Sequence, residues 1–162
     1  MIGRRAAWSA AGLLTIVGFA LGAIAVHRHL EPAEPPPVYV AVGASESVGV
    51  GAAEPALDAW PQVLRRTALP RRTRFTDVAV SGASVPDAIA NQLPRAISLK
   101  PSIVTVWLNV NDIRALELPG NYEKSLRTLV HGLRRGGATK VYVANTPPVE
   151  ALPVVKRIGV PT

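Results

Sequence analysis

The chain has 162 residues, 48% of them hydrophobic and 18% charged, which fits a single globular domain or a membrane-associated protein and excludes a disordered chain. It contains no cysteine, so disulfides, cysteine-ligated zinc and thiol catalysis are excluded. The formal charge is +7, and five arginines lie between Arg65 and Arg74, but no aromatic residues alternate with them as base stacking would require. We therefore expect this run to be a solvated face and expect no nucleic-acid partner.

The first predicted element is a membrane-spanning helix at residues 6–26, which contain no charged side chain and are long enough to cross a bilayer. Two arginines precede this stretch and one arginine closely follows it, so the positive-inside rule places everything after it outside the cytoplasm. We interpret residues 1–30 as a signal anchor. A cleaved signal peptide remains the alternative, because residues 23–25 have the small-x-small pattern of a cleavage site. The protein is then membrane-anchored on the extracytoplasmic side, or secreted.

A proline-rich linker, EPAEPPP at residues 31–37, cannot continue a helix and predicts an extended spacer, so the folded domain is expected at residues 38–162. Strand-like and helix-like segments alternate from there. The predicted strands are VYVAVG (38–43), FTDVAVSG (75–82), SIVTVWL (102–108) and KVYVANTPP (140–148), and the predicted helices are WPQVLRRTAL (60–69), SVPDAIANQLPRAISL (84–99) and NYEKSLRTLVHGLRRGG (121–137). This alternation predicts a parallel sheet with right-handed crossovers and helices on both faces.

Three local patterns refine the helices. Ser84 and Asp87 have capping-box spacing, and Pro94 is expected to end or kink the second helix before RAISL resumes it. The third helix carries an apolar stripe and is expected to close at the glycine pair 136–137. The stripe consists of Tyr122, Leu126, Leu129, Val130 and Leu133.

The loops after the first three strands carry polar or small residues, and in a parallel sheet these loops converge at one edge. The first loop holds Ser45, the second Gly82 and the third Asn111. Together they offer a hydroxyl nucleophile, a bare backbone N–H and a side-chain amide donor, which are the parts of an acyl-transfer site. The alternative is that the glycines serve tight turns and that Ser45 or Ser47 caps the next helix.

At these loops the chain resembles the SGNH or GDSL-type hydrolases. GASESVG is similar to their first block with Ala44 in place of aspartate, VSGAS to their second, and NVND to their third with Asn109 in place of glycine; TPPVEALP resembles their later proline-containing segment. The resemblance implies a flavodoxin-like three-layer α/β/α SGNH fold and an esterase or lipase-like activity. It assigns Ser45 as the nucleophile, and Gly82 and Asn111 to the oxyanion hole.

The neighbouring loop residues Ala44, Glu46, Ser81 and Asp112 are expected to contact the substrate, a small-molecule, lipid or glycan ester. We expect no metal and no other cofactor, because no histidine and carboxylate cluster has ligand spacing.

The chain departs from the family in one respect that concerns the chemistry. The family supplies its general base from a late Asp-x-x-His block, and this sequence has no aspartate after Asp112. His131 lies about 200° around its helix from Leu129 and is expected to face solvent. We therefore interpret the hydrolase domain as C-terminally incomplete.

Two other functions remain open at this point. The first is a non-catalytic relative of the same fold that binds a ligand in the same pocket. The second is a basic membrane-proximal interaction module that uses the arginine run between Arg65 and Arg74.

Overall fold

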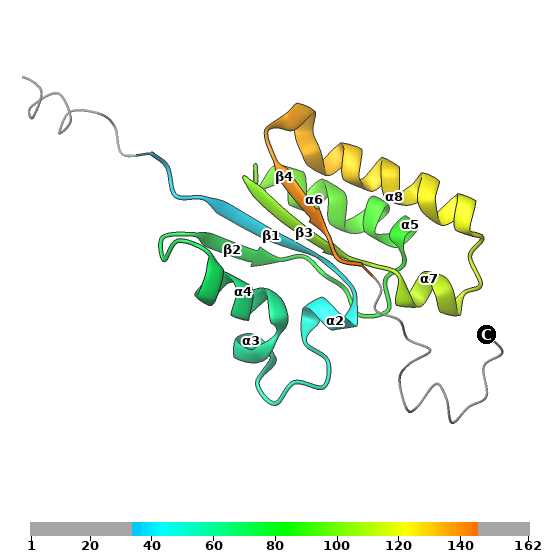
Figure 1. Ribbon diagram of the computed structural model, residues 1–162, viewed down its shortest axis with the longest axis horizontal. Helices are drawn as coiled ribbons and strands as arrows, with labels where there is room; N and C mark the ends of the chain where they lie inside the picture. The colour runs from blue at the N-terminus through cyan, green and yellow to red at the C-terminus, as the bar shows by residue number, and fades with distance from the viewer. Residues whose placement is uncertain (1–33, 146–162) are drawn as a thin grey trace, which may run out of the picture. The chain divides into compact units, whose positions relative to one another are not determined.

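The structure, a computed structural model, describes residues 34–145, and their fold belongs to a compact unit that begins at Pro36. Its centre is a parallel sheet with the strand order β2-β1-β3-β4 (Figure 1). The strands are β1 (Val38–Gly43), β2 (Arg74–Asp77), β3 (Ile103–Trp107) and β4 (Lys140–Val143). The parallel α/β architecture predicted from the sequence is confirmed, and this strand order is the flavodoxin-like one.

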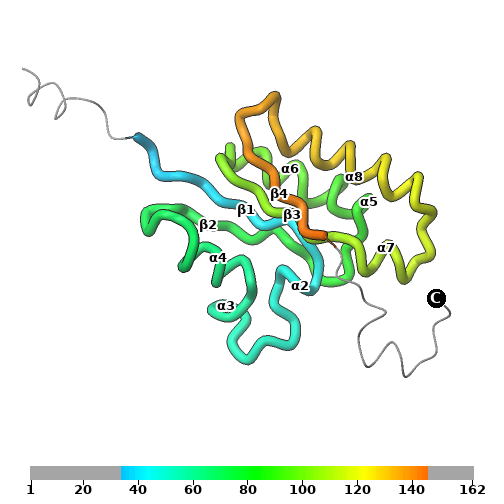
Figure 2. The backbone as a smooth tube through the Cα atoms, viewed as in Figure 1, coloured from blue at the N-terminus to red at the C-terminus, as the bar shows by residue number. Residues whose placement is uncertain are grey.

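Helices cover both faces of the sheet (Figures 1 and 2). On one face lie α2 (Ser45–Val48), α3 (Pro55–Asp58) and α4 (Trp60–Ala68). On the other lie α5 (Val85–Asp87), the π-helical turn η1 (Ala88–Gln92), α6 (Leu93–Ser98) and α8 (Pro119–Arg134). The short helix α7 (Val110–Arg114) precedes α8, and the 3-10 turn η2 (Arg135–Gly137) follows it. The chain changes faces after β2, so the switch point, where open α/β sheets bind ligands, falls between β1 and β3.

The main core lies between the sheet and α8. Val40 and Val42 of β1 and Val104 of β3 are fully buried, as are Leu129 and Leu133 of α8. The remaining residues of the predicted stripe are half-buried, and of these Tyr122 and Leu126 pack against the core. The stripe is therefore confirmed as the inner face of α8, and it places the start of that helix beside the loop after β3.

The opposite face of the sheet is built on aromatic contacts. The rings of Trp60 on α4 and Trp107 on β3 lie 5.7 Å apart, and those of Tyr39 and Phe75 lie 4.9 Å apart. The Tyr39 hydroxyl shares a 2.9 Å hydrogen bond with Thr105 Oγ1, and burial raises the pKa of Tyr39 to about 12. The contact between Trp60 and Trp107 thus packs α4 against this face of the sheet.

The helix predicted over residues 84–99 begins with the expected capping box. The Ser84 N–H donates to Asp87 Oδ2 at 3.0 Å, and the Asp87 N–H donates to Ser84 Oγ at 3.3 Å. The helix does not end before Pro94, which was one of the two expected outcomes. It passes through the π-helical turn η1, which interrupts the regular helix, and places this proline in the first turn of α6. Proline lacks an N–H and its ring collides with the carbonyl four residues earlier in a regular helix. A π-helical turn, with its wider hydrogen-bond spacing, accommodates both.

Several boundaries differ from the prediction, and β4 ends at Val143 where the prediction extends to residue 148. Two further differences concern β2 and α8. The second strand ends at Asp77 and not at Gly82, although the N–H groups of Val78 and Val80 still donate to carbonyls of β1 at 2.9 and 3.2 Å. Helix α8 ends at Arg134, and the following residue, Arg135, adopts the left-handed conformation with φ 47°, one residue before the predicted glycine pair.

Three expectations concern the ends of the chain. The predicted anchor, residues 31–33 of the linker and the segment TPPVEALP lie outside residues 34–145, whereas linker residues 34–37 are described and have no regular secondary structure. Among the residues that the structure does describe, no helix is both long and apolar enough to cross a membrane.

Candidate active site

Backbone contacts bring the loops after β1, β2 and β3 to one edge of the sheet. Gly43 at the end of β1 is paired with Trp107 at the end of β3. The Val80 N–H donates to the Gly43 carbonyl at 3.2 Å, which holds the loop after β2 against β1. Asn111 lies in the first turn of α7, which forms part of the third connection, and its Nδ2 donates to the Ala83 carbonyl of the second loop at 3.0 Å. The predicted convergence of the three loops is thus observed.

Ser45 is the first residue of α2 and is half-buried. Its hydroxyl donates to Glu46 Oε2 at 3.4 Å, a long hydrogen bond to an adjacent side chain. The N–H of a first helical residue has no acceptor within its own helix, so the Ser45 N–H can serve an external oxygen.

Gly82 lies at an exposed turn that follows β2. The Ala83 N–H donates to the Val80 carbonyl at 3.1 Å, and Gly82 has φ 82° at the third position of this turn. That conformation favours glycine, because an L side chain is strained there. The residue type is therefore required by the backbone, and its exposed N–H lies in the same loop as Ser81.

Gly43 is required for a different reason, which is space. A Cβ at this position would lie 2.1 Å from Ser47 Oγ, 2.7 Å from Ser47 Cβ and 3.0 Å from the Trp107 carbonyl oxygen. Ser47 itself is fully buried on the inner side of α2. The glycine thus lets α2 pack directly on the end of β1, which fixes where Ser45 emerges.

Substituting Gly43→Ala is expected to destabilise the protein by about 2 to 3 kcal/mol, because the new methyl group overpacks a site with no room for it. Thermal unfolding of the variant measures this loss. Adding Ser47→Gly removes both nearest atoms and should recover most of the stability, as coupled neighbours do in a double-mutant cycle. Equal losses in the single and double variants would show that the crowding does not cause the effect.

Gln92 is a site residue that the sequence analysis missed. It lies on η1 with 1% of its surface exposed, and its amide makes two hydrogen bonds to one residue of β1. The Gly43 N–H donates to Gln92 Oε1 at 3.0 Å, and Gln92 Nε2 donates to the Gly43 carbonyl at 2.9 Å. A signal was present: Gln92 stands four residues from both Ala88 and Ala96, so a polar side chain falls on the buried face of its helix.

Asp112 is 2% exposed, and its carboxylate accepts the Val85 N–H at 3.0 Å at the start of α5. Burial raises the pKa of Asp112, the hydrogen bond from Val85 opposes this, and the nearby charges of Glu117 and Asp87 add to it. Asp112, which was expected to contact the substrate, therefore binds a backbone N–H and joins the third loop to α5, the helix that follows the second loop.

The raised pKa predicts how stability depends on pH. A carboxyl with a raised pKa in the folded state binds its proton more tightly there, so its contribution to stability is lost as the pH rises through that pKa. The variant Asp112→Asn keeps an oxygen acceptor for Val85 and carries no charge. We expect its melting temperature to rise relative to that of the wild type between about pH 3 and about pH 7.

The matched control is Asp87→Asn. The hydrogen bonds from Ser84 lower the pKa of Asp87, so this variant should lose stability relative to the wild type as the pH rises over the same range. Parallel trends for the two variants would contradict the assignment for Asp112.

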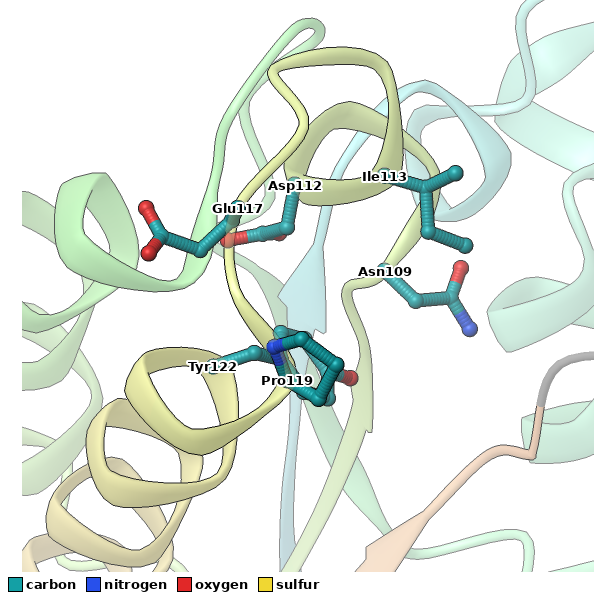
Figure 3. A pocket seen from close by; sticks show the side chains of 6 residues that line it. All are labelled: Asn109, Asp112, Ile113, Glu117, Pro119 and Tyr122. Atoms are coloured by element: carbon teal, nitrogen blue, oxygen red, sulfur yellow. The ribbon is translucent and has the colours of Figure 1, made fainter.

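Two hollows adjoin these loops. One, of ≈ 180 Å³, lies between the loop after β3 and the start of α8 (Figure 3), where Tyr122 Oη donates to the Leu108 carbonyl at 2.7 Å. It is lined by Asn109, Asp112, Ile113, Glu117, Pro119 and Tyr122. The other, of ≈ 280 Å³, borders the second loop. It is lined by Val80, Ser81, Gly82, Ala83, Asp87, Asn91 and Gln92.

The expected substrate contacts differ in how accessible they are. Ser81 is exposed and borders the second hollow, and Asp112 borders the first. Ala44 is 2% exposed and belongs to the core, while the Glu46 carboxylate accepts a hydrogen bond from the Ser45 hydroxyl. The lining of neither hollow includes Ser45.

The structure places no histidine beside Ser45 within the described residues. His131 is exposed on the C-terminal half of α8, as expected from its helical position. Within residues 34–145, no group of three or more histidine, aspartate or glutamate side chains is arranged to hold a metal ion.

The comparison with family models identifies one match. The model described as the GDSL-like lipase/acylhydrolase family matches residues 41–158 of this chain. No curated protein sequence matches this chain.

Solved structures share the fold. A G-D-S-L family protein from Desulfitobacterium hafniense DCB-2 is 15% identical, with a TM-score of 0.60, and covers 75% of this chain and 66% of its own. TesA is 20% identical, with a TM-score of 0.56, and the match covers 74% of this chain and 67% of TesA. A catalytic mutant of Axe2, an acetylxylan esterase from Geobacillus stearothermophilus, is 19% identical, with a TM-score of 0.56. The match covers 74% of this chain and 65% of the Axe2 chain. This chain therefore spans about two thirds of the length of these structures.

Proposed function

Because this chain belongs to the GDSL-like lipase/acylhydrolase family, we propose that it is a serine ester hydrolase with Ser45 as the nucleophile. The observation that carries the proposal is the meeting of three loops at one sheet edge. Ser45 starts the helix after β1, and the loops that hold Gly82 and Asn111 are bonded to β1 and to each other.

In the proposed reaction, Ser45 Oγ attacks the carbonyl carbon of the ester and its proton passes to a general base. The oxyanion that forms accepts hydrogen bonds from the backbone N–H groups of Ser45 and Gly82 and from Asn111 Nδ2. Of the two hydrogens on that nitrogen, one serves the Ala83 carbonyl and the other serves the oxyanion. Collapse of the intermediate breaks the ester C–O bond, the alcohol leaves with the proton, and water then hydrolyses the acyl-serine.

The general base is the part that the described residues do not supply. The family resemblance implies an Asp-x-x-His segment, and the 162 residues contain no such sequence. A second candidate function is a ligand-binding relative of the same fold that does not turn its ligand over. The two candidates differ in whether Ser45 becomes acylated when a base is present.

We further propose that the substrate is a small-molecule, lipid or glycan ester and that residues 1–30 anchor the domain on the extracytoplasmic side of a membrane. The uncharged stretch 6–26 and the arginines before it support the anchor. If this segment is cleaved, the domain is secreted.

The test supplies the base from solution. Imidazole is added to the full chain with p-nitrophenyl acetate, and the proposal expects a rate increase that depends on Ser45, together with an acetyl group on Ser45 detected by mass spectrometry. Binding of the ester without acylation would support the second candidate instead.

A further inference from the structure

We propose that Gln92 is a positioning residue for the proposed hydrolysis. It holds the backbone N–H and C=O of Gly43 and thereby fixes the nucleophile loop and the loop of Gly82 relative to each other. The inference rests on the proposed function, and it concerns a side chain that touches neither the substrate nor the reacting atoms.

The first step is the hydrogen bonding of Gln92. Its amide oxygen accepts the Gly43 N–H at 3.0 Å and its amide nitrogen donates to the Gly43 carbonyl at 2.9 Å. Both backbone groups of one residue are therefore satisfied by one buried side chain. Among uncharged side chains only asparagine and glutamine offer a carbonyl acceptor and an N–H donor together, so this contact cannot be made by an apolar residue.

The second step is the place of this contact in the fold. We call the pair of hydrogen bonds between Gln92 and Gly43 the clamp. Gly43 stands two residues before Ser45, and its carbonyl also accepts the Val80 N–H at 3.2 Å, two residues before Gly82. The backbone unit that Gln92 holds, the N–H and C=O of Gly43, is thus the point at which the first and second loops leave the sheet. A shift of this unit moves the nucleophile and one oxyanion donor together, and displacements of about 1 Å in such groups can cost 100-fold in rate.

The third step is the close packing around Gly43 and Gln92. The space in front of Gly43 is filled by Ser47, which a Cβ on Gly43 would approach to 2.1 Å. Gln92 itself is the last residue of the π-helical turn, between the buried Ala88 and Ala96. The helix geometry thus directs a long polar side chain toward the end of β1, where both of its hydrogen-bonding groups are used.

The test compares Gln92→Leu and Gln92→Glu with the wild type in the imidazole-supported hydrolysis of p-nitrophenyl acetate. Gln92→Leu removes both hydrogen bonds, and we expect kcat to fall by about 10- to 100-fold with little change in KM. A neutral glutamic acid can accept from the Gly43 N–H and donate to its carbonyl, whereas the carboxylate cannot donate. The ratio of wild-type to Gln92→Glu activity should therefore shrink from about pH 8 to about pH 5.5, because burial raises the pKa of a carboxyl.

Two control variants separate positioning from folding. Gln62→Leu changes the other glutamine, which lies on α4 on the opposite face of the sheet, and should leave kcat unchanged. Leu133→Ala opens a cavity in the core on α8 and should lower the melting temperature without lowering the kcat of the folded protein. A fall in kcat with Leu133→Ala as large as that with Gln92→Leu, or an unchanged kcat in Gln92→Leu, would overturn the inference.

Amide hydrogen exchange tests the clamp independently of activity. Gln92→Leu is expected to speed exchange at residues 43–49 and 78–83 and to leave the amides of α8 unchanged. If the wild type shows no Ser45-dependent hydrolysis, the proposed function fails, and this exchange pattern still decides whether Gln92 orders the two loops. Equal acceleration throughout the domain would overturn the clamp.

Discussion

Replacing Ser45 with alanine is expected to abolish the imidazole-dependent hydrolysis of p-nitrophenyl acetate. A general base accelerates such reactions by about 10² to 10⁴-fold when it is held in place, and dissolved imidazole should recover part of this. In Ser45→Ala there is no hydroxyl for the base to activate, so the rate should equal that of imidazole and ester alone. Initial rates at increasing imidazole concentration, with this background subtracted, measure the effect.

The base has to be supplied because of how such groups work together. When the base is missing, removing the nucleophile as well changes the rate little, since the remaining acceleration comes from substrate binding and the oxyanion donors. An assay without imidazole would therefore not reveal the role of Ser45. For the same reason, a serine nucleophile is indicated when the part of the rate that increases with imidazole concentration is lost in the variant.

The matched control is Ser47→Ala in the same short helix. Ser47 is fully buried, and its hydroxyl has no hydrogen-bond partner among the described residues, so its removal should leave both the fold and the imidazole-dependent rate intact. An imidazole-dependent rate that persists in Ser45→Ala and disappears in Ser47→Ala would contradict the assignment of the nucleophile.

The strands and the edge at which the site lies could be predicted because they depend on local pattern and on one geometric rule. Residues 38–43 and 102–108 are rich in apolar and β-branched residues, and the structure has β1 and β3 at these places. The carboxyl ends of parallel strands share an edge, so loops far apart in sequence could be expected to meet. The pattern overestimates the length of β2, because residues 78–80 are apolar and stay hydrogen-bonded to β1 but lie beyond the end of the regular strand at Asp77.

The contacts that hold the site together could not be predicted, because each joins residues that are distant in the sequence. Gln92 reaches back to Gly43, and Asp112 reaches back to Val85. Nothing in the local pattern indicates which buried polar group will meet which backbone amide, although a glutamine on an apolar helix face indicates that some partner must exist. The sequence therefore indicated which residues could do chemistry better than which residues hold them in position.

Asn111→Ala is expected to lower kcat by about 10² to 10³-fold, because it removes one donor to the oxyanion of the transition state. KM should change little, since this hydrogen bond strengthens only as charge develops on the carbonyl oxygen. The substitution also leaves the Ala83 carbonyl without its 3.0 Å donor, so a stability loss of about 1 kcal/mol should accompany it. Steady-state kinetics with imidazole and thermal unfolding measure the two effects separately.

Asn111→Asp distinguishes the two roles of the side chain. An ionised carboxylate keeps the shape of asparagine but donates no hydrogen, so it repels both the Ala83 carbonyl and the oxyanion. We expect kcat to fall at least as far as in Asn111→Ala, and the stability loss to be larger at neutral pH than in acid, where a protonated carboxyl can again donate to Ala83. A kcat within about threefold of the wild type in both variants would assign Asn111 only to the joining of the second and third loops, and the oxyanion would then depend on the backbone N–H groups of Ser45 and Gly82.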